Sequence, residues 1–178
     1  HKYLDGPTLD YALTRAATGD RLSETMARQT LGQGLKLIDP VWGGVFQYSD
    51  QVDWRSPHYE KIMVSQVHSL RAYAQAHLLW GDKNPRYLEA AMRIRAYLRD
   101  HLRGSNGGFF TSQDADVDAQ LDGKAFYGLD ASARLKLGKA PRIDRNQYAR
   151  ENGWVIAALT KLYDATNDVA ILEEAQLA

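Results

Sequence analysis

The sequence contains no cysteine among its 178 residues. These residues therefore form no disulfide, supply no thiolate to a metal and provide no cysteine nucleophile. An excess of charge is also missing, because 22 Lys and Arg residues balance 22 Asp and Glu residues. Proteins that bind nucleic acid, anionic membranes or polyanionic substrates usually carry a basic excess. The composition therefore argues against all three kinds of partner.

Long apolar runs are absent as well. No segment approaches the roughly 20 apolar residues that cross a bilayer, and the N-terminus has no basic region followed by an apolar one. No His–Glu spacing matches a zinc site, and no glycine-rich phosphate loop precedes a helix. We expect a soluble protein with no membrane partner, no metal and no cofactor. We expect a cytoplasmic location, although no targeting motif in the sequence indicates a compartment.

Apolar residues recur three or four positions apart along most of the chain, which is typical of amphipathic helices. The length suits one domain with a sizeable core. Strand signals are weak and confined to two short segments, Val45–Tyr48 and Phe109–Thr111. The expected helices run from Leu9 to Ala16, Leu22 to Ile38, Pro57 to Trp80, Tyr87 to Leu102 and Trp154 to Ala165, with a sixth beginning at Ile171.

Turn signals separate these helices in a repeating pattern. Thr18–Asp20, Trp80–Asp82 and Thr166–Asp168 each place Gly or Asn where a helix ends and Asp where the next begins, which is typical of αα-hairpins. A second repeat, Gly43–Phe46 and Gly107–Phe110, follows a helix each time with two glycines and an aromatic residue. Hairpins of this kind stack into an open solenoid or a closed ring.

The segment Trp54–Lys61 concentrates reactive side chains. Ser56 and Pro57 predict a helix start, with Ser as the cap and Pro in the first helical position. His58 would then lie in the first turn, where the helix dipole favours a neutral imidazole that accepts a proton. His58 and Glu60 would lie about 160° apart around the axis and would not face each other. In the alternative reading, Glu60 complements the dipole and His58 bonds a neighbouring loop.

A second cluster of reactive side chains, Ser112–Asp118, is rich in acids. It does not fit a calcium loop, because Ala119 and Ala125 stand at the sixth and twelfth positions. It is either a solvated acidic loop or a segment that places Asp114 or Asp116 in a cavity as an acid, a base or an acceptor for sugar hydroxyls.

The remaining histidines and the tryptophans carry weaker signals. His77 is expected in the core, His68 on the polar side of its helix and His101 in a last helical turn. Most of the four tryptophans are expected in the core, although aromatic walls at loop edges also suit sugar rings.

Several of these motifs together resemble a known family. In order and spacing they are similar to the thioredoxin-domain-containing proteins of the spermatogenesis-associated type, and the resemblance covers nearly the whole chain. The motifs that carry it are Gly43–Ser49, Trp54, Pro57–Met63, Gly107–Asp116, Asp122–Tyr127 and Glu151–Trp154.

The resemblance implies a thioredoxin-like domain, absent from these residues, followed by an (α/α)6 toroid similar to those of N-acylglucosamine 2-epimerases and six-hairpin glycosidases. Residues 1–178 would form the first half of that toroid. Relatives of this fold bind sugars at the mouth of the bowl. The residues that the resemblance places there are Trp54, His58, Glu60, Lys61, Gln113, Asp114, Asp116 and Asn152.

The sequence therefore predicts an all-α domain of αα-hairpin repeats that forms the first half of an (α/α)6 toroid. The expected function is carbohydrate binding or processing by epimerisation, isomerisation or hydrolysis. His58 would be the proton acceptor, Asp114 or Asp116 its carboxylate partner and Trp54 a stacking wall. The alternative is a non-catalytic module that serves an attached thioredoxin-like domain. Apolar faces at the open toroid edge are expected to be covered by a second copy of the chain.

Overall fold

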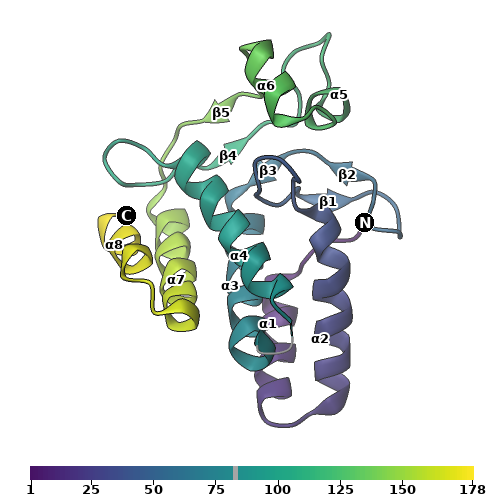
Figure 1. Cartoon of the computed structure of the whole chain (residues 1–178), viewed down its shortest axis with the longest axis vertical. Coiled ribbons are helices and arrows are strands. Elements are labelled where there is room, and N and C mark those ends of the chain that lie inside the picture. Colours follow the sequence, from purple (N-terminus) through teal and green to yellow (C-terminus); the bar gives the residue numbers. More distant parts are fainter. Residues whose placement is uncertain (82–83) are drawn as a thin grey trace.

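The computed structural model describes residues 1–81 and 84–178 (Figure 1). Within them the chain is mainly helical, as predicted, and its strands are two residues long. The helices are α1 (Gly6–Ala17), α2 (Arg21–Gly34), α3 (Met63–Trp80), α4 (Arg86–Tyr97), α5 (Gly123–Tyr127), α6 (Ala131–Leu137), α7 (Ala149–Thr166) and α8 (Val169–Leu177), with a 3-10 turn η1 (Leu35–Leu37) and a π-helical turn η3 (Leu98–Leu102). The strands are β1 (Tyr48–Ser49), β2 (Pro57–His58), β3 (Lys61–Ile62), β4 (Ser112–Gln113) and β5 (Ile143–Asp144).

Three αα-hairpins, α1/α2, α3/α4 and α7/α8, follow one another along the chain. The turns predicted at Thr18–Asp20 and Thr166–Asp168 are confirmed, because Asp20 accepts hydrogen bonds from Leu22 N and Ser23 N of α2 and Asp168 accepts one from Ala170 N of α8. Asn167 ends α7 in a left-handed conformation. The predicted cap at Asp82 lies outside the described residues.

Helix α3 occupies the middle of the molecule and packs against α1, α4 and α7. Helices α1, α3 and α7 therefore form an inner row, and α2, α4 and α8 lie behind it as the second helices of their hairpins. The core between the two layers contains Leu13, Leu70, Tyr73, Ile94 and Leu159, whose side chains are buried. Burial of each such side chain stabilises the fold by about 1.5–3 kcal/mol.

The two long loops, residues 38–62 and 103–148, lead into α3 and α7 and lie at the same end of the helices (Figure 1). Strand β4 joins them, because it pairs with β3 on one side and with β5 on the other. Lys61 lies opposite Gln113, and Ser112 lies opposite Asp144. The structure therefore brings the two reactive segments together at one end of the helices.

The predicted helix start at Pro57 is wrong, because α3 begins at Met63. Pro57–His58 pairs with Tyr48–Ser49, and Lys61–Ile62 pairs with Ser112–Gln113. These backbone hydrogen bonds to distant segments replace those of an additional helical turn. The helix-dipole argument for His58 therefore does not apply.

Two other boundaries differ from the sequence-based expectation. Helix α7 begins at Ala149 rather than at Trp154, and α5 and α6 lie in a segment for which no helix was predicted. Asp122 and Asp130 begin these short helices by accepting bonds from Ala125 N and Ala133 N. Helices of five and seven residues are too short to show a helical period.

Candidate functional site

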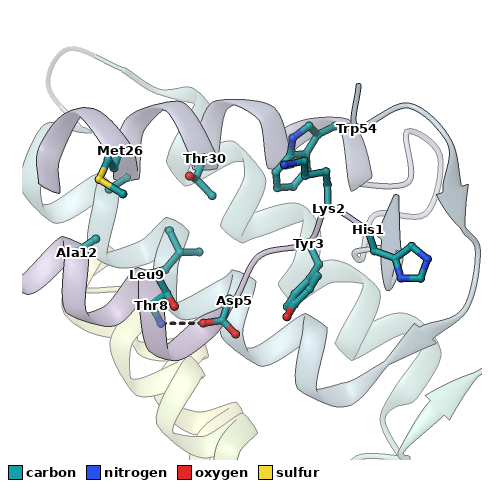
Figure 2. Close-up of a pocket in the computed structure, with 11 residues that line it drawn as sticks. His1, Lys2, Tyr3, Asp5, Thr8, Leu9, Ala12, Met26, Thr30 and Trp54 are labelled. Carbon is teal, nitrogen blue, oxygen red and sulfur yellow. Dashed lines mark hydrogen bonds between the residues drawn. The ribbon is translucent and has the colours of Figure 1, made fainter. Parts of the chain in front are cut away.

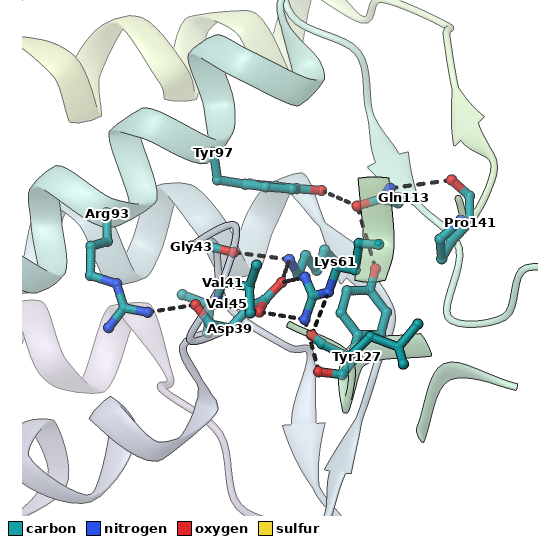
Figure 3. A network of polar contacts seen from close by, with 12 residues as sticks. Asp39, Val41, Gly43, Val45, Lys61, Arg93, Tyr97, Gln113, Tyr127 and Pro141 are labelled. Atoms are coloured by element: carbon teal, nitrogen blue, oxygen red, sulfur yellow. Dashed lines mark hydrogen bonds and ion pairs between the residues drawn. The ribbon is translucent and has the colours of Figure 1, made fainter. Parts of the chain in front are cut away.

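Asp39, Lys61 and Arg134 form a buried ionic cluster within the segments 38–62 and 103–148, and Figure 3 shows Asp39 and Lys61 in it. Arg134 donates two hydrogen bonds to the carboxylate of Asp39, of 2.8 and 3.1 Å, and Lys61 Nζ donates a third of 2.8 Å. Lys61 also donates to the carbonyl of Gly43, and Arg134 to those of Tyr127 and Leu129. This cluster, named here the Asp39 cluster, ties together the Gly43 loop, β3 and α6.

The Asp39 cluster contains two cations and one carboxylate, so it carries an excess of one positive charge. Aromatic rings accommodate this excess: Lys61 Nζ lies 4.3 Å from the ring centre of Tyr97 and 4.9 Å from that of Tyr127. Burial lowers the pKa of Lys61 to about 8, although the charge of Asp39 opposes the shift. Burial would raise the pKa of Asp39, but the bonds from Arg134 and the charge of Lys61 outweigh it and lower the pKa. Asp39 is therefore ionised at pH 7, and Lys61 is mainly protonated.

The glycine pair of the first loop allows the close approach that this cluster requires. Gly43 and Gly44 have positive φ angles of 73° and 72°. A β-carbon on Gly43 would lie 2.2 Å from the carbonyl oxygen of Arg93, and one on Gly44 would lie 2.5 Å from the ring of Tyr97. Both positions therefore require glycine for packing as well as for backbone conformation.

Gln113, a predicted substrate-binding residue, is buried beside the Asp39 cluster (Figure 3). Its Oε1 accepts hydrogen bonds from Tyr97 at 3.1 Å and Tyr127 at 3.4 Å, and its Nε2 donates to the carbonyl of Pro141 at 3.2 Å. Its side chain therefore holds the second loop to α4.

Asn152, another predicted substrate-binding residue, bonds both backbone groups of Phe109. The Asn152 Oδ1 atom accepts from Phe109 N at 2.7 Å, and Nδ2 donates to the Phe109 carbonyl at 3.1 Å. It thus fixes the second glycine-aromatic loop to the first turn of α7. Lys61, Gln113 and Asn152 all lie beneath the surface, where they position the loops.

His58 and Glu60 form a pair at the surface of the loop end. His58 Nε2 lies 3.6 Å from Glu60 Oε2, and both side chains are partly exposed. The expectation that they cannot face each other is wrong, because the segment is extended and alternate side chains of an extended chain share a face. The His58 ring stacks on Tyr48 with ring centres 4.8 Å apart and planes within 5° of parallel.

The two predicted catalytic acids have protein partners. Asp114 Oδ2 accepts a hydrogen bond of 3.0 Å from the exposed side chain of Arg142. Asp116 Oδ1 accepts a bond of 2.6 Å from the backbone amide of Gly123, at the start of α5. Among the described residues, no hydrogen bond or ion pair joins either carboxylate to His58.

Trp54 lies in a groove of about 330 Å³ between α1 and α2 (Figure 2). Its backbone has a φ of 63°, which is rare for an aromatic residue, and its side chain packs against the core. The N-terminal residues Tyr3 and Asp5 line this groove and also line the pocket described next. The chain segment from Tyr3 to Asp5 thus lies between the groove that contains Trp54 and that pocket.

A pocket of about 290 Å³ lies at the N-terminal ends of α1 and α3 and is named here the inner-wall pocket. It combines polar side chains with two tyrosine rings. Tyr48, which stacks on His58, is one of these rings. The lining side chains used below are Tyr3, Asp5, Gln47, Tyr48, Ser65 and His68.

His68 occupies one wall of the inner-wall pocket and lies directly against Gly6. A β-carbon on Gly6 would lie 2.4 Å from the His68 ring, so glycine is required at this helix start. Burial lowers the pKa of His68, Asp10 raises it and Arg71 lowers it further, and the net shift is downward. The imidazole is therefore neutral at pH 7. The sequence placed His68 correctly on the polar side of its helix but gave no reason to assign it to a site.

The same face of the inner row continues onto α7. Trp154 lies beside His68, with ring centres 6.3 Å apart, and the guanidinium of Arg150 covers the Trp154 ring at 4.9 Å. Glu151, in the first turn of α7, accepts a hydrogen bond from the hydroxyl of Thr111. Polar and aromatic side chains therefore line this face from α1 to α7.

In the part of the chain that the structure describes, no three His, Asp or Glu side chains gather as metal ligands would. Among the helices of residues 1–81 and 84–178, none has the length and apolar content needed to cross a membrane.

The hairpins and their inner row define the class of fold: an all-α arrangement of αα-hairpins that makes the first half of an (α/α)6 toroid. An inactive variant of an α-1,6-mannanase from a Salegentibacter species, in complex with α-1,6-mannotriose, matches with a TM-score of 0.68 and 16% identity over 98% of this chain and 45% of that chain. Cellobiose 2-epimerase from Spirochaeta thermophila matches with a TM-score of 0.70 and 16% identity over 98% of this chain and 40% of that chain. At this identity the likeness shows the fold alone.

In sequence, the chain is similar to human spermatogenesis-associated protein 20, with 37% identity over 78 residues. The match covers 44% of this chain and spans 10% of the length of that relative. This similarity confirms the resemblance inferred from the glycine-aromatic and acidic motifs. No family model matches the chain.

Proposed function

We propose that the inner-wall pocket binds a carbohydrate and that the protein binds or processes sugars. The observation that carries this proposal is the meeting of Asp5, Gln47, Ser65 and His68 with tyrosine rings in one pocket of about 290 Å³. Sugar hydroxyls bind such polar groups, while the apolar face of a sugar ring stacks on aromatic side chains. The mannanase bound to mannotriose and the cellobiose epimerase support a sugar ligand for this fold.

Within this proposal, His68 is the proton acceptor. Burial lowers the pKa of His68 and favours the neutral imidazole, which removes a proton from a sugar carbon. The imidazolium formed in that step returns the proton during epimerisation or isomerisation. His58, the predicted proton acceptor, lies behind Tyr48 and is paired with Glu60, so it supports the same wall of the pocket.

Hydrolysis is the less favoured reaction. It would require two carboxylates facing each other across the glycosidic bond. Asp116 is engaged by the amide of Gly123 and holds the acidic loop. Of the two acids, Asp114 is the better candidate for a catalytic carboxylate. Its ion pair with Arg142 lies at the surface, so breaking that pair costs little free energy.

Thermal unfolding with a panel of sugars tests the proposal. The panel contains mannose, glucose, N-acetylglucosamine, cellobiose and α-1,6-mannotriose. A sugar present at about ten times its Kd adds roughly 1.4 kcal/mol, which raises Tm by about 3–6 °C for a domain of this size. His68→Ala and Tyr48→Ala should abolish the shift, whereas Leu135→Ala, at an exposed residue of α6, should retain it. If no sugar shifts Tm, or if the shift survives both pocket variants, the proposal is wrong.

One observation favours the second candidate function, a non-catalytic module. Lys61, Gln113, Asp116 and Asn152 all make loop-to-helix or loop-to-loop bonds, as a scaffold that presents a rigid surface to an attached thioredoxin-like domain requires. Calorimetric titration of the chain with a thioredoxin-like domain tests this function. Binding of that domain with no response to any sugar would favour the module over the sugar-processing protein.

A further inference from the structure

A pocket of about 520 Å³ lies between the π-helical turn η3 and α6, the short helix at the top of Figure 1, and is named here the α6 pocket. Its walls are Trp42, His101 and residues between 131 and 140, so none of them comes from the first or the third hairpin. It shares no residue with the inner-wall pocket. Its volume is that of a typical small-molecule site.

Arg134 belongs both to the wall of the α6 pocket and to the Asp39 cluster. Its Nε donates to Leu129, its Nη2 to Asp39 and Tyr127, and its Nη1 to Asp39. Because Nη1 carries two hydrogens, one of them has no partner among the described residues. The α6 pocket is thus a place where a ligand can reach the excess positive charge of the Asp39 cluster.

Lys139 adds a second cation to the wall of the α6 pocket. Its Nζ donates a hydrogen bond of 2.5 Å to Asp118, and both side chains of this ion pair are well exposed to water. Such a pair is weak, so the ammonium group can turn to a ligand at little cost. Among the described residues, no Asp or Glu lines the pocket. An anion would therefore meet positive charge without a competing carboxylate.

His101 adds a hydrogen-bond donor to the same wall. Its ring lies against that of Trp42, with centres 4.5 Å apart, and stacks on Tyr97 at 5.3 Å. Burial lowers the pKa of His101, and the charge of Lys61 lowers it further, so the imidazole is neutral at pH 7 and has one N–H group. In the described part of the chain neither ring nitrogen has a hydrogen-bond partner, and neither is fully buried. This N–H group is therefore available to a ligand.

The position of His101 depends on η3, whose π-helical backbone is rare. Turns of this kind occur frequently at functional sites. The opposite wall is apolar, because Leu135 and Ala131 of α6 line the pocket. Leu135 is 83% accessible, although it is a large apolar residue. A ligand with an apolar body would cover it.

We propose that the α6 pocket binds a small organic carboxylate with an apolar body. The carboxylate lies toward Arg134, Lys139 and the N–H group of His101, and the apolar body covers Leu135 and Ala131. The bound anion offsets the excess positive charge of the Asp39 cluster. The α6 pocket is a second site, and the inference does not depend on whether the inner-wall pocket binds a sugar.

Calorimetric titration with benzoate and hexanoate tests the proposal, and benzamide and hexanamide are the matched neutral probes. For ligands of this size we expect the two acids to bind with a Kd of about 1 mM or below. Each amide should bind at least about tenfold more weakly than its acid, because it lacks the charge. No binding of either acid at several times this concentration, or equal binding of acid and amide, would overturn the proposal.

Two pairs of variants locate the site. Ala131→Leu fills the α6 pocket from an exposed position and should weaken benzoate binding by about tenfold or more, whereas Ser132→Leu adds the same bulk outside the pocket and should not. Lys139→Gln should weaken it by up to about fivefold, and Lys136→Gln, which removes an exposed cation outside the pocket, should leave it unchanged.

Thermal unfolding confirms that each of these variants is folded. Equal affinities of Ala131→Leu and Ser132→Leu for benzoate would place the acid elsewhere on the protein and overturn the proposal. Equal effects of Lys139→Gln and Lys136→Gln would show attraction by overall charge alone and would also overturn it.

Discussion

The imidazole of His68 lies against the backbone of Gly6, where a β-carbon would approach it to 2.4 Å. Gly6 is the first residue of α1, and His68 lies in the second turn of α3. The contact thus joins two neighbouring helices of the inner row at the wall of the inner-wall pocket. This contact is possible only because residue 6 is a glycine and has no β-carbon.

Gly6→Ala should displace His68 and remove the stabilisation by sugar. Overpacking at such a contact costs about 1–3 kcal/mol of unfolding free energy. In a His68→Ala background the same substitution should be neutral or stabilising, because alanine is the better helix former. Urea denaturation of the two single variants and the double variant measures this coupling. An equal cost of Gly6→Ala in both backgrounds would contradict the prediction.

Asp39 should be the most sensitive member of the Asp39 cluster. Asp39→Asn leaves Lys61 and Arg134 buried without a counter-charge, and we expect a loss of about 3–5 kcal/mol in unfolding free energy. Lys61→Met retains the double hydrogen bond between Asp39 and Arg134, so its cost should be lower, about 1–3 kcal/mol.

The exposed pair of Arg142 and Asp114 provides the control for the Asp39 cluster. Arg142→Met should change the unfolding free energy by no more than about 1 kcal/mol. Urea denaturation of Asp39→Asn, Lys61→Met and Arg142→Met measures the loss of unfolding free energy in each variant and so ranks the three losses. A Lys61 variant less stable than the Asp39 variant would show that Lys61, rather than the carboxylate, holds the cluster together.

Gly43→Ala should destabilise the protein more than the same change at another glycine with a similar backbone. Gly43 and Gly138 have φ angles of 73° and 66°, but an added β-carbon meets the carbonyl of Arg93 only at Gly43, and at Gly138 nothing lies within 4 Å. The left-handed conformation alone costs alanine about 1–2 kcal/mol. The excess loss in Gly43→Ala over Gly138→Ala, measured by thermal unfolding, reports the close approach of the loop to α4. Equal losses of stability in Gly43→Ala and Gly138→Ala would contradict the prediction.

Stability should change with pH in two opposite directions above neutrality. Burial lowers the pKa of Lys61 to about 8 from 10.5, so the unfolded chain binds more protons between these values and the unfolding free energy rises with pH there. Lys61→Met should remove this rise. Urea denaturation of the wild-type protein and of Lys61→Met between pH 7 and about 10 measures this rise in unfolding free energy. Identical pH profiles of the two proteins would contradict the prediction.

Above pH 10 the buried tyrosines should reverse the trend. Burial raises the pKa of Tyr73, Tyr97 and Tyr127 above the ordinary value of 10.0. The native state then holds more protons than the unfolded chain, so the unfolding free energy falls as pH rises through 10. Tyrosinate absorbance should show that these three buried residues ionise only when the protein unfolds. Their ionisation in the native protein near pH 10 would refute this.

Much of the helical fold could be predicted from local sequence. The Asp residues at 20 and 168 cap helices as expected, because capping depends on residues only two or three positions apart. The period of apolar residues in α4 likewise depends on neighbours one turn away. The single apolar face predicted for α3 is not found, because that helix is buried around most of its circumference. The family resemblance implied that residues of both reactive segments lie at the mouth of the bowl, and the structure brings the two segments together at one end of the helices.

The candidate site was harder to predict, because contacts between distant segments decide it. Lys61 is expected at the mouth of the bowl, but its side chain is buried against Asp39 and beside Arg134 of α6, and Arg134 is 95 residues away from Asp39. The pocket beside His68 exists only where α1 packs against α3, and Gly6 gives no local sign of that contact.

The sequence by itself determined most of the long helices, the hairpin turns at Asp20 and Asp168 and which residues supply reactive groups, since these follow from interactions within a few residues. Only the tertiary structure decided that residues 57–62 are extended, that Lys61 is buried and that His68 lines a pocket. The physical reason is that hydrogen bonds and charge pairs with distant segments outweigh the small local preference for another turn of helix.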